Sequence, residues 1–435
     1  MKRTDCDLAI IGAGVSGLAA AATLGRVGKT VRCLEAADRV GGRILTVHDP
    51  LAPLPIELGA EFVHGRPPET WNLIRSAGLT AYEHSSQALH IDRHRVIASK
   101  EVGEIADKVL SQMAKPAGKK DESFEDYLGR SRQGADAKSW ASVQVEGFNA
   151  ARKDVISVAS LIQDAEAAEQ IDGDRAFRIM NGYDAIVNSL LRSIPDYSSV
   201  VQLSSVVTRV KWRRNFVDVE YNSALDGENG RLRCRKVIVT VPLGVLQAAL
   251  RGPGAIEFDP EPSGILKAAR SLQFGKVYRM TLRFRSAFWE QDQKMKRVGF
   301  LISKDPQFFA WWTMHPIIAP LLTGWCAGSA AEQFISSDRA AIIDAALGSL
   351  KRILKRAIPR PESVYFHDWQ ADPFFRGAYS YTPAHALGAH ETLATPVDGT
   401  LLFAGEATET KGHSGTVHGA IASGMRAAKL ALASH

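Results

Sequence analysis

The 435-residue sequence has few cysteines and no cysteine motif. Cys6, Cys33, Cys234 and Cys326 are far apart and form no CxxC pair, so we expect neither a disulfide framework nor a metal site. Three of the four adjoin or lie in apolar, strand-like runs. We therefore expect buried free thiols in a reducing, cytoplasmic compartment.

Long apolar runs and strong charge are also missing. No run of 18 or more apolar residues occurs, so we expect no membrane span. A net charge of +6 is small for this length and does not argue for nucleic-acid binding. Lys2 and Arg3 precede an apolar run, but that run contributes the first strand and helix, so we expect no cleaved signal. The sequence offers no Ser/His/Asp or Cys/His arrangement of a nucleophilic enzyme.

The residues that are present indicate a globular protein of two domains. Hydrophobic residues make up 45% and the mean hydropathy is -0.10, both ordinary for a globular chain. A chain of this length exceeds what one hydrophobic core usually holds, so two domains are expected.

The segment from Asp7 to Arg43 predicts a strand, a helix and a second strand. Leu8–Ile11 is a short apolar run that stops at glycine, which is typical of a strand buried on both faces. Small and apolar residues at helical spacing follow from Val15 to Gly28. Thr30–Leu34 is the second strand, and Glu35 closes it.

The glycines at the first turn indicate dinucleotide binding. In Gly12-x-Gly14-x-x-Gly17 the glycines allow a tight turn, close approach to a pyrophosphate and close packing of helix on strand. The N–H groups at the helix start favour phosphate, and Glu35 can accept hydrogen bonds from a ribose diol. A chance glycine turn is the alternative.

The residues after Glu35 distinguish a flavin from a nicotinamide. Glu35-x-x-x-Arg39-x-Gly41-Gly42-Arg43 resembles the extended fingerprint of FAD-binding oxidoreductases of the glutathione-reductase type. Paired glycines allow close backbone approach, and an arginine can bind phosphate through two hydrogen bonds. The alternative is a solvated basic turn.

Four further segments resemble the flavin-dependent amine oxidases, the family of monoamine oxidases, polyamine oxidases and lysine-specific histone demethylases. They are Ile56–Gly65 with Leu-Gly-Ala and His-Gly, Arg235–Gly244, Asp372–Tyr381, and Leu401–Ala420 with Gly415-Thr-Val-His-Gly-Ala420. The resemblance covers nearly the whole chain but is weak from Pro68 to Arg178.

The resemblance implies an α/β fold with a Rossmann-like FAD-binding domain and an α+β substrate domain with an antiparallel or mixed sheet. We expect the FAD-binding domain in 1–78, 180–272 and 388–435, and the substrate domain in 79–179 and 273–387. By the same resemblance, the FAD contacts are Gly12, Gly14, Val15, Ser16, Gly17, Glu35, Ala36, Arg39, Gly41, Gly42, Arg43, Gly59, Ala60, Glu61, Val207, Val241, Trp369, Gly405, Glu406, Thr416, Val417 and Ala420.

The resemblance also suggests the reacting groups. Lys276 is the candidate for a lysine that holds a water on flavin N5, and an exposed strand-edge lysine is the alternative. Tyr379 would form one wall beside the ring. Glu61, His64, Thr416 and His413 are candidates for the substrate pocket; for His64 an ordinary loop histidine is equally compatible.

Two positions depart from the monoamine oxidases. Ala378 stands where those enzymes carry the cysteine that binds FAD covalently, so we expect non-covalent FAD. Thr416 stands in place of a second tyrosine, which argues against a closed cage of two tyrosines. The acids Asp164, Glu166 and Glu169 can attract a cationic substrate or form a solvated helix face.

The implied activity is oxidation of a primary or secondary amine, a monoamine or polyamine. Hydride passes to flavin N5, water converts the imine to an aldehyde, and dioxygen becomes hydrogen peroxide. The partners are thus a small amine and O2. An L-amino acid oxidase is the first alternative, with Arg66 or Arg376 as the carboxylate-binding cation. A desaturase, a porphyrinogen oxidase and a binding protein that merely retains FAD are further alternatives. The oligomeric state is not predicted.

Overall fold

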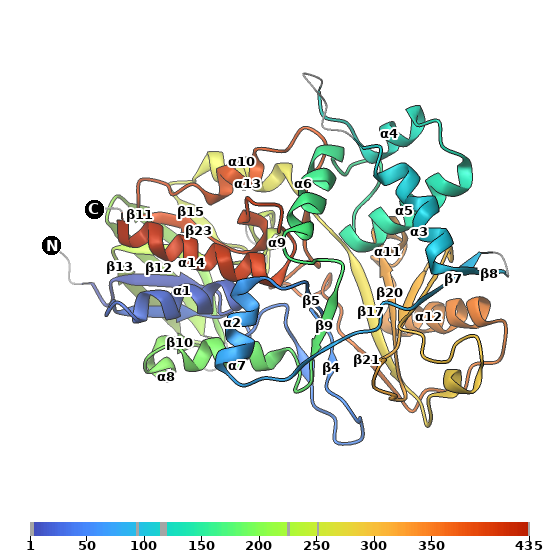
Figure 1. Ribbon diagram of the computed structural model, residues 1–435. Coiled ribbons are helices and arrows are strands. Elements are labelled where there is room, and N and C mark those ends of the chain that lie inside the picture. The colour runs from blue at the N-terminus through green and yellow to red at the C-terminus, as the bar shows by residue number, and fades with distance from the viewer. Residues whose placement is uncertain (1–3, 93–94, 114–119, 224–226, 250–251, 434–435) are drawn as a thin grey trace.

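The computed structural model describes residues 4–92, 95–113, 120–223, 227–249 and 252–433. One half of the fold is built on a parallel sheet of five strands (Figure 1). Their order is β10 (Val201–Gln202), β2 (Val31–Leu34), β1 (Leu8–Ile11), β14 (Lys236–Val239) and β23 (Leu401–Phe403). Short strands of mostly apolar residues are typical of such a sheet, because both of its faces are covered.

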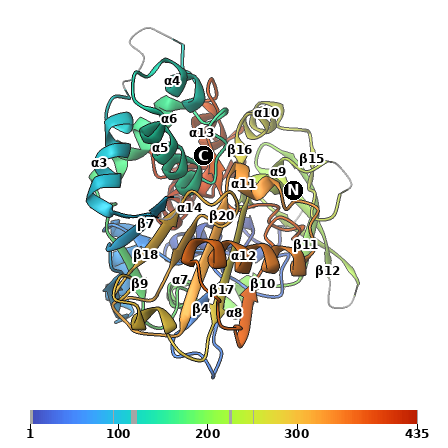
Figure 2. The ribbon, with the colours of Figure 1, turned by 90° about the vertical axis from the view of Figure 1, so that its right-hand side faces the viewer.

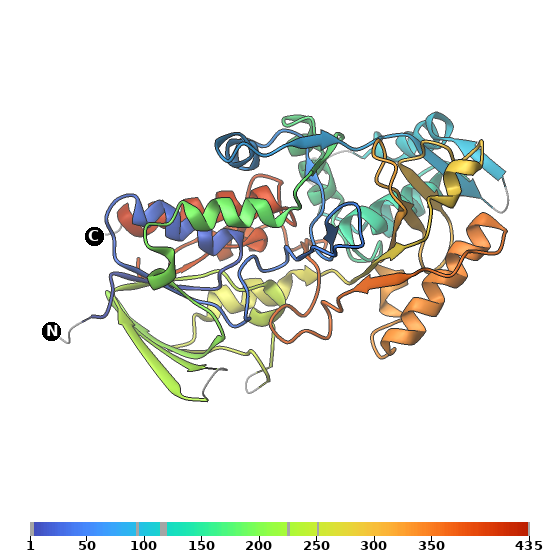
Figure 3. The ribbon, with the colours of Figure 1, turned by 90° about the horizontal axis from the view of Figure 1, so that it is seen from below.

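The central strand β1 is buried on both faces, which confirms the prediction. Leu8 and Ile10 pack against α1 (Val15–Gly25), α7 (Asp184–Arg192) and α14 (Val417–Ala433), whereas Ala9 and Ile11 point to the other face. Figure 3 shows the helices above the sheet and a second, mixed sheet below it. That second sheet contains β13 (Asn229–Cys234), β12 (Phe216–Ser223), β11 (Ser205–Arg213) and the short β15 (Glu257–Asp259).

The first and the last helix of the chain lie side by side. A Cβ on Gly424 of α14 would come within 2.1 Å of the carbonyl oxygen of Ser16 on α1. The hydroxyls of Ser16 and Ser423 lie 3.3 Å apart. The glycine therefore allows the two ends of the chain to meet around the same edge of the sheet.

The other half is built on a mixed sheet of seven strands (Figure 2). Its order is β21 (Ser363–Phe366), β17 (Val277–Arg283), β20 (Leu321–Ala327), β19 (Ala310–Trp312), β18 (Phe300–Ser303), β7 (Ala88–Asp92) and β8 (Arg95–Ala98). One face packs against α12 (Arg339–Leu354) through Tyr278, Met280 and Leu282 of β17. Four helices, α3 (Ser99–Leu110), α4 (Phe124–Arg130), α5 (Ala135–Asn149) and α6 (Val158–Glu169), form a separate layer.

Two helices begin at a side-chain cap. Ser123 accepts a hydrogen bond from the N–H of Asp126 at the start of α4, and Asp338 accepts one from Ala341 at the start of α12. The apolar segment 274–282 is not one continuous strand, because Gly275 exchanges hydrogen bonds with Ala378 and Tyr379. Lys276 therefore lies between β16 (Gln273–Phe274) and β17.

The architecture confirms the predicted fold class, an α/β domain joined to an α+β part. The five strands of the parallel sheet all fall in the predicted FAD-binding segments, and the seven of the mixed sheet in the predicted substrate segments. The exact domain limits stay a prediction. All four cysteines are free and buried, as expected. Within the described residues, no helix is long and apolar enough to cross a membrane.

Candidate functional site

The glycine turn after β1 leaves the start of α1 open. Gly12 has φ +104°, a conformation that favours glycine, and Gly14 is the N-cap residue without a side-chain cap. A Cβ on Gly17 would lie 1.9 Å from the carbonyl oxygen of Gly12, so the helix can approach the strand only with glycine there. The N–H groups of Val15 and Ser16 belong to this uncapped first turn, which is suited to phosphate.

Glu35 lies beside this turn at the end of β2. Its carboxylate accepts hydrogen bonds from the N–H of Ala13 at 2.6 Å and of Ala37 at 2.9 Å, and burial raises its pKa. The carboxylate has further lone pairs for a diol. The Glu35 carbonyl accepts the N–H of Ser205, which brings the first residues of β11, including the buried Val207, to the end of β2.

Gly41 and Gly42 lie next to the start of α1. We call the backbone that runs from here to Gly59–Ala60 the backbone track. The N–H of Gly41 donates to the carbonyl of Ala13 at 2.9 Å, and a Cβ on Gly42 would lie 3.2 Å from the Cα of Gly14. Gly41 and Gly42 have φ values of +102° and +60°. Any side chain here would fill the space beside the helix start, so the glycines keep a cradle open.

The track extends to Gly59 and Ala60. The N–H of Ala60 donates to the carbonyl of Arg43 at 3.1 Å. A Cβ on Gly59 would lie 1.9 Å from the same oxygen. Trp369 closes the track from the side: its indole N–H donates to the carbonyl of Leu58 at 2.8 Å, and the guanidinium of Arg39 lies 5.9 Å from its ring centroid.

Glu406 ties together three segments that are far apart in sequence. One oxygen accepts Arg43 Nη1 at 2.9 Å; the other accepts the hydroxyl of Ser380 at 2.6 Å and the N–H of Gly415 at 3.1 Å. Although burial raises its pKa, Arg43 and Ser380 hold the pKa below the ordinary value. The carboxylate thus acts as a clamp between these segments, and the predicted contact of Glu406 with FAD stays a prediction.

Tyr379 lies where the resemblance expects a wall. Its ring is beside Gly415, where a Cβ would come within 3.2 Å of the ring, and its hydroxyl donates to the carbonyl of Phe148 at 2.7 Å. Burial raises the pKa of Tyr379, so the phenol is neutral at physiological pH. A neutral, fixed ring is suited to a packing role.

Thr416 caps α14. Its hydroxyl accepts the N–H of Gly419 at 3.0 Å and donates to the carbonyl of His413 at 2.6 Å. The hydroxyl is thus used within the helix start, and the place of Thr416 in the substrate pocket stays a prediction. The backbone of Val417 and Ala420 belongs to the same first turn.

Three histidines lie near the start of α14. The rings of His413 and His418 meet edge to face at 4.8 Å, and burial, followed by the charges of His413 and His64, lowers the pKa of His418 to about 3. His64 is accessible to solvent, yet the protein around it lowers its pKa by desolvation. The pocket assignment of His64 and His413 stays a prediction.

Lys276 and Glu61, two of the predicted site residues, both have ionic partners, and their roles at the site stay predictions. Lys276 Nζ is 3.8 Å from Glu332, and its side chain is 33% exposed. The side chain of Glu61 is buried between Arg178 and Arg279 and has no exposed surface to offer an amine. Sequence reasoning missed these two arginines, although an arginine inside the apolar pattern of 277–282 signals a special environment.

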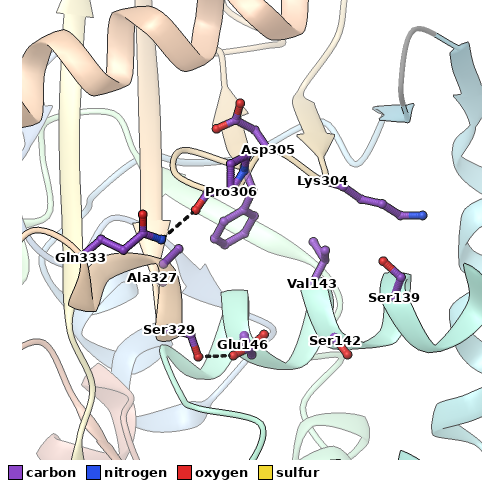
Figure 4. A pocket seen from close by; sticks show the side chains of 12 residues that line it. Ser139, Ser142, Val143, Glu146, Lys304, Asp305, Pro306, Ala327, Ser329 and Gln333 are labelled. Carbon is purple, nitrogen blue, oxygen red and sulfur yellow. Dashed lines mark hydrogen bonds between the residues drawn. The ribbon is translucent and has the colours of Figure 1, made fainter. Parts of the chain in front are cut away.

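The described residues form a narrow crevice and a cavity at the surface. A narrow crevice is lined by Arg43, Val241, Gly405 and Glu406 and coincides with the predicted cofactor contacts. A cavity of about 340 Å³ lies at the surface between α5 and the β18–β19 connection, with Ser142, Glu146 and Lys304 in its lining (Figure 4). No predicted site residue lines that cavity. No group of metal-binding side chains occurs among the residues described.

The chain is similar to known proteins along nearly its full length. Residues 15–432 match the family model described as flavin containing amine oxidoreductase. Polyamine oxidase 5 of Oryza sativa subsp. japonica is 28% identical, with 97% of this chain and 86% of that protein covered. A lysine-specific histone demethylase 1 homolog 2 from the same organism is 28% identical over 98% of this chain. The chain spans only 57% of that protein's length.

Solved structures show the same fold. Putrescine oxidase bound to putrescine has a TM-score of 0.82 at 22% identity, with 98% of each chain covered. Cyclohexylamine oxidase from Brevibacterium oxydans has a TM-score of 0.78 at 22% identity, with 98% of this chain and 99% of the other covered.

Proposed function

The chain belongs to the flavin containing amine oxidoreductases, and we propose that it binds FAD without a covalent bond and oxidises a primary or secondary amine, with O2 as the electron acceptor. The observation that carries this proposal is the continuous track from Gly14 past Gly41 and Arg43 to Gly59, which the clamp of Glu406 joins to Gly415 before α14. Residues from both ends of the chain thus surround one elongated site.

The residues of this track fit a dinucleotide with a flavin. The uncapped turn at Gly14–Gly17 would hold the phosphates, and Glu35 would accept the hydroxyls of the ribose. Val207 would lie beside the adenine side, since β11 begins next to Glu35. The first turn of α14, with Val417 and Ala420, would face the ring system, where the helix dipole favours negative charge.

Non-covalent attachment is supported by the position of the sulfur atoms. Ala378 lies at the clamp, where its carbonyl accepts Arg43, and a methyl group cannot form a thioether. All four cysteines are buried in apolar surroundings. Free buried thiols also support a cytoplasmic location.

A bound flavin supplies the redox chemistry by accepting a hydride from the carbon beside the amine nitrogen and passing electrons to dioxygen. The protein's task is then to orient a neutral amine and exclude water. Tyr379 provides a neutral wall, since its hydroxyl is fixed on Phe148. Desolvation lowers the pKa of His64, which favours an uncharged imidazole and suits an amine that must lose its proton before oxidation.

An amino acid oxidase needs a cation for the substrate carboxylate, and both candidate arginines have other partners in the structure. The guanidinium of Arg66 stacks on Trp71 and Phe177 at 4.9 and 5.1 Å from the ring centroids. Arg376 donates to the carbonyls of Pro373 and Pro253. Both side chains therefore make structural contacts that the binding of a substrate carboxylate would disturb.

The experiment is an amine panel scored by peroxide release from the purified protein. Diamines and polyamines, aromatic monoamines and the matching α-amino acids are compared at equal concentration. Peroxide from at least one amine supports the proposal. Turnover of α-amino acids alone would favour the amino acid oxidase, and bound FAD without any turnover would favour a binding protein.

A further inference from the structure

Glu61 is the centre of a buried charge cluster. Its oxygens lie 2.9 Å from Arg178 Nη2 on β9 (Ala176–Ile179) and in contact with Arg279 Nη2 on β17. The indole N–H of Trp312 also donates to Glu61, at 3.0 Å. All three charged residues are 6% exposed or less. Burial alone would raise the pKa of Glu61, but the two arginines hold it below the ordinary value.

The cluster contains more positive than negative charge. Two guanidinium groups face one ionised carboxylate, and an arginine stays protonated in proteins. The nearest further carboxyl in the cluster is Glu57, whose pKa burial raises to about 7, so it balances the second arginine only in part at neutral pH. His84, packed on the same cluster, is kept uncharged because desolvation lowers its pKa. The surplus charge lies in an interior with little water to screen it.

Arg279 carries this charge to the backbone track of the proposed site. Its Nη1 donates to the carbonyl of Gly59 at 2.7 Å, and its guanidinium lies 5.7 Å from the ring centroid of Trp312. Through this bond β17 fixes the segment Gly59–Ala60, which continues from Arg43. A ring held along that segment would lie in the field of Arg279.

The alternation of side chains along β17 explains why Lys276 does not contact the Gly59–Ala60 backbone as Arg279 does. Successive side chains of a strand point to opposite faces. Tyr278, Met280 and Leu282 face α12, whereas Arg279 faces Trp312 and Gly59. Lys276 shares the parity of Tyr278 and reaches Glu332 instead.

Resting on the proposed function, we infer that Arg279, and not Lys276, is the cation of β17 that acts on the flavin. It is a positioning residue with two effects: its hydrogen bond holds the Gly59–Ala60 backbone, and its charge, in excess of Glu61, stabilises the reduced flavin, which carries more negative charge than the oxidised form. The flavin midpoint potential is the property that this charge sets.

The test measures the midpoint potential of the FAD-loaded protein by reductive titration against a reference dye. Arg279→Met removes the charge and the hydrogen bond, Arg279→Gln keeps a donor without the charge, and Arg279→Lys keeps the charge on a shorter side chain. Lys276→Met and Arg283→Met are matched controls. Arg283 is a buried arginine of the same strand that pairs with Glu362 at 2.6 Å.

We expect Arg279→Met and Arg279→Gln to lower the ratio of reduced to oxidised flavin at a fixed potential by roughly tenfold or more, about 30 mV for two electrons. Arg279→Lys and both controls should stay within about threefold of the wild type. If Arg279→Met does not fold, Arg279→Gln decides, because it retains a donor for Gly59.

Two results would overturn the inference. In one, Arg279→Gln keeps the wild-type potential. In the other, Lys276→Met lowers it more than Arg279→Gln does. If Arg279 had only a structural role, all three variants would retain FAD less well. Arg279→Lys and Arg279→Gln would then not differ in their flavin midpoint potential. Failure of the proposed function is a different outcome, since a wild-type protein that takes up no FAD has no flavin potential to measure.

Discussion

Replacing Glu61 by Gln should be among the most costly single-atom changes in this protein. The carboxylate accepts hydrogen bonds from Arg279 and Trp312, forms an ion pair with Arg178 at 2.9 Å, and is buried. The amide has one acceptor oxygen and two donors of its own, so an N–H group would face an arginine. Leaving a buried charge without its partner costs roughly 3 to 5 kcal/mol. With two arginines sharing one carboxylate, we expect the upper part of that range.

Glu57→Gln is the matched control for this prediction. Glu57 is as buried as Glu61, but its carboxyl accepts only the hydroxyl of Thr46 at 2.6 Å and the N–H of Tyr183 at 2.8 Å. Loss of one such bond costs about 1 kcal/mol. Urea unfolding followed by circular dichroism, at fixed FAD and pH 4.5, compares the two variants where the Glu57 carboxyl of the folded protein is protonated. Equal costs, or a Glu61→Gln cost below about 1 kcal/mol, would refute the reasoning on the charge cluster.

Three more predictions follow from single contacts. Burial raises the pKa of Glu57 from 4.5 in the unfolded chain to about 7; the folded state therefore binds the extra proton, and the wild type should lose about 3 kcal/mol relative to Glu57→Gln as pH rises from 4.5 to 7. Urea titrations at several pH values check this, and a parallel course of both proteins would contradict it. Gly17→Ala should weaken FAD binding by roughly tenfold or more, because its Cβ would meet the carbonyl of Gly12. The control Gly129→Ala has open space around the added Cβ and should bind FAD normally. A fluorescence titration with FAD compares the two variants. Thr416→Ala removes the cap of α14 and should cost about 1 kcal/mol in urea, with Thr416→Ser restoring most of it; no loss on uncapping would show that the helix start is held otherwise.

Local patterns predicted the parts of the fold whose geometry is local. The strand Leu8–Ile11 and the glycine turn after it follow from residue size and backbone freedom alone, and the structure has both. Ser123 and Asp338 cap their helices because a short side-chain oxygen next to a helix start has one nearby set of donors.

The hydrogen-bond partners of the side chains at the site could not be predicted from local sequence patterns. Glu406 binds Ser380 and Gly415 of neighbouring segments and Arg43, which lies near the other end of the chain. A motif places a carboxylate but does not say which donors surround it. Such partners depend on packing between the two halves of the chain.

The choice between Lys276 and Arg279 depends on strand register. A break of two residues, Gly275 and Lys276, separates β16 from β17 and sets where β17 begins. Shifting a strand by one residue moves every side chain to the other face. The break arises from hydrogen bonds with Ala378 and Tyr379, about a hundred residues away, so the sequence of the strand alone does not contain it.

The central claim is that both ends of the chain enclose one flavin that takes electrons from an amine. The most direct measurement is the visible spectrum of the FAD-loaded protein under argon before and after addition of the amine panel. The account predicts a yellow protein whose absorbance bleaches with at least one amine and returns when air is admitted, with peroxide released. A protein that stays colourless in excess FAD, or a bound flavin that no amine bleaches, would contradict it.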